Sequence, residues 1–94
     1  MNTEYYCDQQ KYGASFFKVL KRTAKSVTVV RVNGKATKQG TIPTDEVMNG
    51  CEPMRRKIFN FSKNKEKSAE YIEIDMGCDA HLWNGEAVTG YLSI

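Results

Sequence analysis

Residues 15–32 read SFFKVLKRTAKSVTVVRV, and this stretch decides the fold class. Two runs rich in aromatic and β-branched residues, 15–21 and 26–32, are separated by the four residues RTAK. Residues of these types favour strands, and a connection of this length suits a tight antiparallel turn. The stretch therefore predicts a β-hairpin, and the sequence on both sides of it predicts further strands.

The residues that follow the hairpin predict a return strand and one helical turn. Asn33-Gly34 offers the positive φ angles of a two-residue turn, so residues 35–42 are expected to form a third, weaker strand. Thr44 is expected to cap a single helical turn over residues 45–48, which Asn49-Gly50 would end.

The second half of the chain predicts two more hairpins. Residues 54–61 and 70–76 have strand composition and are joined by a polar loop, and Asn84-Gly85 is flanked by apolar residues on both sides. The last hairpin is therefore expected between residues 80–83 and 87–91. Residues 3–12 leave two alternatives open, a short helix or an edge strand.

Length and composition predict a single domain over residues 1–94. A chain of 94 residues with 40% hydrophobic and 27% charged residues is typical of one globular domain with a small core. We expect an all-β fold with five to seven strands, which is either a small SH3-like or OB-like barrel or a strongly twisted antiparallel meander, because a flat sheet would leave its edges exposed. The alternative is a twisted open sheet covered by one N-terminal helix.

The sequence also predicts a location. No apolar run approaches the roughly 20 residues that span a bilayer, and the N-terminus lacks the basic start and apolar middle of a signal peptide. The three cysteines are too few for the paired framework of a secreted domain, so we expect reduced thiols. We expect a cytoplasmic protein with no membrane partner.

Charge is distributed unevenly along the chain. Residues 1–44 hold eight Lys or Arg and two acidic residues, a net charge of +6, whereas residues 45–94 hold six and nine, a net charge of −3. Between Asp8 and Asp45 no acidic residue occurs. The first hairpin is therefore expected to present a positive surface.

Strand alternation predicts which cations face solvent. Lys18 is expected on the solvent face and Lys21 on the face of Val19, although Lys21 is close enough to the turn to join the exposed cations. Lys and Arg that neutralise phosphates release counterions, so this surface favours a nucleic acid or a nucleoprotein as partner. The alternative is that the cations block edge pairing and keep a small protein soluble. The expected binding residues are Lys18, Lys21, Arg22, Lys25, Arg31, Arg55 and Arg56.

Aromatic residues lie between the cations in the sequence. Tyr12, Phe16, Phe59 and Tyr71 could stack on unpaired bases if some of them face outward, and otherwise they belong to the core. Trp83, the only tryptophan, is expected to cap the core because a small barrel needs one large apolar side chain.

Metal binding and catalysis have weak signals. Cys78 and His81 have the spacing of a zinc-ligand pair, and Cys7 and Cys51 could complete a set of four, but structural zinc sites usually contain two close pairs. A cysteine nucleophile would also need an orienting group and an oxyanion hole, which no motif marks. We therefore expect no metal, no cofactor and no enzymatic activity.

Three segments resemble a family of small β-proteins from phages and mobile elements of bacteria: KRTAKSVTV at 21–29, CEPMRRK at 51–57 and AHLWNGEAV at 80–88. The chain departs from that pattern at Cys51 and His81. The resemblance implies an accessory protein, and by analogy an inhibitor of host defence such as an anti-CRISPR protein.

Together these observations predict a non-enzymatic binding module. Its expected role is a phage-type inhibitor of a bacterial defence or nucleic-acid-processing complex, acting through the basic hairpin. Direct binding of DNA or RNA is the alternative, and a zinc-binding or cysteine enzyme is a distant third.

Overall fold

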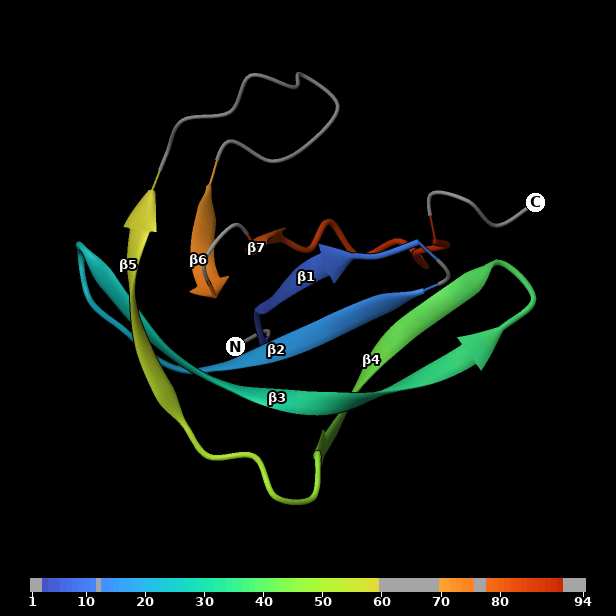
Figure 1. Cartoon of the computed structure of the whole chain (residues 1–94), viewed down its shortest axis with the longest axis horizontal. Coiled ribbons are helices and arrows are strands. Elements are labelled where there is room, and N and C mark those ends of the chain that lie inside the picture. Colours follow the sequence, from blue (N-terminus) through green and yellow to red (C-terminus); the bar gives the residue numbers. More distant parts are fainter. Residues whose placement is uncertain (1–2, 12, 60–69, 76–77, 91–94) are drawn as a thin grey trace.

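A computed structural model of the chain describes residues 3–11, 13–59, 70–75 and 78–90 (Figure 1). Every regular element in these ranges is a β-strand, so the all-β prediction is confirmed and residues 5–9 form a strand rather than a helix. The strands are β1 (Tyr5–Gln9), β2 (Ala14–Arg22), β3 (Ser26–Thr37), β4 (Gly40–Val47), β5 (Met54–Phe59), β6 (Tyr71–Asp75) and β7 (Cys78–Leu82).

Six of the strands close into an antiparallel barrel. The sheet order is β2-β1-β7-β6-β5-β3-β4, and the additional pairing of β2 with β3 joins the two sides of the sheet. β4 and β5 lie along the same edge of β3, β5 beside its first half and β4 beside its second half (Figure 1). The barrel is therefore a simple up-and-down meander in which one strand position is shared by β4 and β5.

The first hairpin forms as predicted, whereas the predicted turn at Asn33-Gly34 is wrong. β3 continues through both residues, and the chain turns at Lys38 and Gln39 instead, where Gly40 adopts a φ of 138°. Gly34 is needed for close approach, because a Cβ there would lie 2.6 Å from the Thr41 side chain. The glycine therefore lets β4 pack tightly on β3.

Two other local predictions are also wrong. Residues 45–47 belong to β4 and are extended, and Val47 pairs with Val32 of β3 in place of a helical turn. Val88 exchanges both backbone hydrogen bonds with Thr41, each 2.8 Å long, and so lies beside β4 rather than in a last hairpin. The predicted strands 54–61 and 70–76 correspond to β5 and β6, while residues 60–61 and 76, the loop 62–69 and residue 91 lie outside the described residues.

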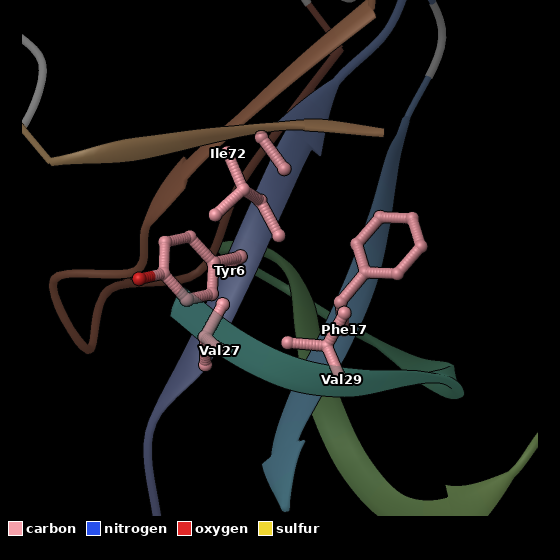
Figure 2. Close-up of a cluster of buried hydrophobic side chains, with 6 residues drawn as sticks. Tyr6, Phe17, Val27, Val29 and Ile72 are labelled. Atoms are coloured by element: carbon pink, nitrogen blue, oxygen red, sulfur yellow. The ribbon is translucent and has the colours of Figure 1, made fainter. Parts of the chain in front are cut away.

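The interior of the barrel holds the main core. Tyr6, Phe17, Val29 and Ile72 point toward one another from four strands, and each is at most 4% exposed (Figure 2). Burying a side chain of this size contributes about 1.5–3 kcal/mol. The Tyr6 hydroxyl points away from this cluster, toward one end of the barrel (Figure 2).

A second core lies on the outer side of the wall made by β1, β2 and β3. Phe16, Val30 and Val32 are buried there and are covered partly by Trp83 and Val88. Trp83 meets Phe16 edge to face, with ring centroids 6.0 Å apart. Trp83 therefore covers this outer core rather than the barrel interior.

Candidate functional site

A row of polar side chains crosses the outer face of β2, β3 and β5. A β-bulge between Val19 and Lys21 inserts Leu20 as an extra residue, so that Lys21 rather than Leu20 is paired with Thr28. Thr28 is paired in turn with Arg55 of β5. The bulge thus moves Lys21 from the predicted face of Val19 to the outer face, in one row with Arg55.

A second row lies beside the first, next to the turn between β2 and β3. Ser26 is paired with Lys57, and the Ser26 hydroxyl accepts a hydrogen bond of 3.1 Å from Arg55 Nε. Thr23 Oγ1 accepts hydrogen bonds from the backbone N–H groups of Lys25 and Ser26, which fixes the turn. Lys25 therefore lies at the tip of the hairpin, beside the two rows.

We call Lys21, Lys25, Arg55 and Lys57 the cationic face. All four side chains are exposed, and none of them lies within 4 Å of a carboxylate in the described part of the chain. Two shallow depressions of about 120 and 630 Å³ share Thr23, Ser26 and Arg55 in their linings. Hydroxyl groups and cations thus line the same open surface, which is the chemistry that binds phosphate groups.

Two of the predicted binding residues are neutralised by carboxylates. Lys18 Nζ lies 3.3 Å from a carboxylate oxygen of Asp45 on β4. Arg22 binds two carboxylates, Glu4 through Nε and Glu70 through Nη2, each at 2.9 Å. The charges of these two cations are balanced by carboxylates of the same chain, so they offer little charge to a partner.

Arg22 also contacts the hydroxyl of Tyr6, which donates a hydrogen bond to Glu70. Burial disfavours the charged form of Glu70, but the hydrogen bonds from Tyr6 and Arg22 outweigh it and lower the pKa of its carboxyl. Burial, together with the hydrogen bond to Glu70, raises the pKa of Tyr6 well above its usual value. This cluster is a structural network at the end of the barrel.

The two remaining predicted residues point inward. Arg31 Nη2 donates to Ser15 Oγ at 3.0 Å, and Arg31 Nε is buried with no hydrogen-bond partner among the described residues. Arg56 donates to the carbonyl oxygens of Arg55 and Ile74, and so bridges the gap where β5 and β6 separate. Of the seven predicted residues, the structure therefore brings together Lys21, Lys25 and Arg55.

The sequence prediction missed Lys57, although the signal was present. In the run 54–57, Arg55 and Lys57 are two residues apart and so share one face of β5, while Arg56 faces the other way. The structure follows this alternation, with Arg55 and Lys57 exposed and Arg56 half-buried.

A row of three rings continues the surface across β5, β6 and β7. Phe59 and Tyr71 are paired and stacked, with centroids 5.3 Å apart and planes 18° apart, and His81 lies 5.5 Å beyond Tyr71. Lys57 Nζ lies 5.4 Å from the Phe59 ring centroid. We call Phe59, Tyr71 and His81 the aromatic row, which begins where the cationic face ends.

An acidic pair borders this surface. Glu73 and Asp79 are opposite each other on β6 and β7 and both are exposed. Neither lies within 4 Å of a Lys or Arg in the described ranges. Like charges opposite each other repel, so the pair marks the side of the surface that a phosphate chain would avoid.

Among the described residues, the cysteines and the histidine do not form the predicted set of four ligands. Cys78 is exposed at the start of β7, and His81 is three residues along the same strand, so these two side chains leave opposite faces. Cys7 is paired with His81 across β1 and β7, so only one of the cysteines lies beside the histidine on the same face. Across residues 3–11, 13–59, 70–75 and 78–90, no group of three or more His, Cys, Asp or Glu is placed to hold a metal ion.

No family model matches this sequence, and neither a curated protein nor a solved structure is significantly similar to it. The described residues include no helix with the length and hydropathy of a membrane span. The surface chemistry of the chain itself is therefore the guide to its function.

Proposed function

We propose that this chain is a non-enzymatic binding module that contacts nucleic acid directly through the cationic face. The observation that carries the proposal is the convergence of Lys21, Lys25, Arg55 and Lys57 on one open surface, with no carboxylate of the described residues within 4 Å. Unpaired cations on a rigid wall neutralise phosphates at little conformational cost, because the barrel already holds the strands that carry them.

The number of cations on the face predicts how strongly the affinity for nucleic acid depends on salt. Each phosphate neutralised on a single strand changes the slope of log K against log salt by about −0.7, so four contacts predict a slope of about −3. The affinity should therefore fall about 50-fold between about 50 and 200 mM salt. Such a slope, measured by fluorescence anisotropy with labelled DNA and RNA, tests the proposal.

Matched variants locate the surface. Lys25→Gln removes a cation at the tip of the β2–β3 hairpin and should reduce the slope by about 0.7, whereas Lys38→Gln removes one at the tip of the β3–β4 hairpin and should leave it unchanged. Equal slopes for both variants, or no binding at the lowest salt, would contradict the proposal.

The acidic pair favours a second candidate, the inhibitor of a defence or nucleic-acid-processing complex. A target protein that binds nucleic acid presents cations on its own surface. Glu73 and Asp79 are two exposed carboxylates that could pair with those cations. This candidate predicts a co-eluting species with a nuclease complex, and charge reversal by Glu73→Lys should slow its formation. An unchanged association rate would remove the acidic pair from the argument.

A further inference from the structure

We propose that the nucleic acid bound by this protein is single-stranded, with its phosphates on the cationic face and its bases stacked along the aromatic row. This inference rests on the proposed function, since it assigns the ligand class of the same surface. The observation behind it is that Phe59, Tyr71 and His81 continue the cationic face without a break, from β5 through β6 to β7.

The rings leave room for bases. Ring atoms in contact lie about 3.5–4 Å apart, so a centroid separation of 5.3 Å between two nearly parallel rings means that Phe59 and Tyr71 are offset. Part of each ring face is therefore left uncovered by the other ring, and both side chains are only half-buried. A base has a π-face whatever its sequence, so such offset rings bind unpaired bases without sequence preference.

Lys57 connects the two parts of the surface. Its Nζ lies over the Phe59 ring, while its backbone position is paired with Ser26 beside Arg55. A base that stacks on this face of Phe59 takes the place of the ammonium group, which then lies next to the phosphate attached to that base. One residue thus joins the phosphate contact to the base contact.

The acidic pair gives the bound strand a direction across the sheet. Glu73 lies two residues along β6 from Tyr71, and Asp79 two residues along β7 from His81, so the carboxylates lie on the same outer face as the rings. They repel phosphates but not uncharged bases. The backbone is therefore held over β2, β3 and β5, and the bases point toward β6 and β7.

A duplex cannot make these contacts, because its base faces are already stacked on one another. The cationic face remains open to duplex phosphates, so duplex binding is expected to be weaker but still salt-dependent. The ligand class therefore follows from the aromatic row, whereas the requirement for phosphate follows from the cationic face.

The test compares ligands that share phosphates and differ in bases. Anisotropy is measured with an oligo-dT of about 12 nucleotides, an oligo-U of the same length, an abasic strand of equal charge and a duplex. We expect oligo-dT and oligo-U to bind about 5- to 150-fold more tightly than the abasic strand for each ring engaged, with equal salt slopes.

Variants assign the effect to the rings. Phe59→Leu and Tyr71→Leu should bring the affinity for oligo-dT toward that of the abasic strand without changing the salt slope, whereas Tyr71→Phe, which keeps the ring, should not. Tyr5→Leu removes a ring that lies on β1, outside the aromatic row, where Tyr5 packs on Trp83, and serves as the matched control.

The outcomes separate the two proposals. Equal affinity for the abasic strand and oligo-dT, or tighter binding of the duplex, overturns the single-strand inference and leaves the cationic face standing. Failure of all four ligands to bind at low salt overturns both. Because the ligand comparison uses the unmodified chain, the result does not depend on whether a variant folds.

Discussion

Replacing Tyr6 with phenylalanine removes one hydroxyl from the end of the barrel and leaves the buried ring in place. That hydroxyl donates a hydrogen bond to Glu70 and accepts one of 3.2 Å from Arg22. Hydrogen bonds to charged groups contribute about 1.5–3 kcal/mol each to stability. Arg22 and Glu70 keep their own contact of 2.9 Å, so we expect the free energy of unfolding to fall by the lower figure, about 1.5 kcal/mol. For a chain of this size, the loss corresponds to about 6–12 °C in Tm.

The loss should depend on pH because the hydroxyl stabilises the carboxylate form of Glu70. The pKa of this carboxyl is lower in the folded chain than in a solvated glutamate, because the hydrogen bonds from Tyr6 and Arg22 outweigh the opposing effect of burial. Its stabilising effect is therefore fully present above the unfolded-state pKa of about 4.3 and is lost as the pH falls through the folded-state pKa. The difference between wild type and Tyr6→Phe should be largest near neutral pH and shrink in acid.

Urea denaturation of both proteins at about pH 7 and at about pH 3 measures the two differences. Tyr5→Phe is the matched control, since its hydroxyl bonds to the exposed Asp45 at 2.5 Å and its removal should cost less. An equal loss at both pH values, or a loss no larger than that of Tyr5→Phe, would refute the assignment of the Tyr6 hydroxyl to the Glu70 carboxylate.

Two further predictions concern the turn at Gly40 and the phenol of Tyr5. Gly40→Ala should lower the free energy of unfolding by at least about 1–3 kcal/mol, because φ is 138° and a Cβ would lie 2.8 Å from the backbone of Val88. Gly13→Ala is the control: a Cβ there meets nothing within 4 Å, so the free energy of unfolding should change by less than about 1 kcal/mol. Equal losses of stability for the two variants, measured by calorimetry, would contradict the strain at Gly40. Burial, with the hydrogen bond to Asp45, raises the pKa of Tyr5 to about 12, so its contribution to stability is present below about pH 10 and lost as the pH rises through 12. An ultraviolet titration in which every tyrosine ionises near pH 10 would contradict this contact.

The predicted elements that the structure confirms are those with a strong local signal. Residues 15–21 and 26–32 form a hairpin because alternating aromatic and β-branched side chains fit a half-buried wall, and hydrogen bonds of Thr23 with Lys25 and Ser26 close the turn between them. β5 and β6 follow from the same kind of signal.

The predictions that failed depend on which strands pair with one another. Asn33-Gly34 has the composition of a turn, but pairing of β3 with β4 keeps the strand extended through it. Val88 pairs with Thr41, which is more than forty residues away, rather than with the nearby residues 80–83. No local propensity contains that information, because the choice between two extended partners is made by packing.

The sequence predicted that the candidate surface is positively charged, but not which residues form it. The excess of positive charge in the first half is a property of the sequence, but Lys18 and Arg22 meet carboxylates from other parts of the chain, and Arg31 and Arg56 point inward. The remaining cations gather with Lys57 only because β5 lies beside β3. Strand pairing, and not composition, selected the residues that stay free to bind.

By itself, the sequence determined that the chain is all-β, that its first hairpin forms and that this half carries unbalanced positive charge, because alternation and charge are local properties. The tertiary structure alone decided the closure of the barrel through β2 and β3, and the one-residue bulge at Leu20 that moves Lys21 to the outer face. The physical reason is that side chains on a strand alternate with a period of two, so a shift of a single residue in register exchanges inside and outside, and register is set by contacts between strands.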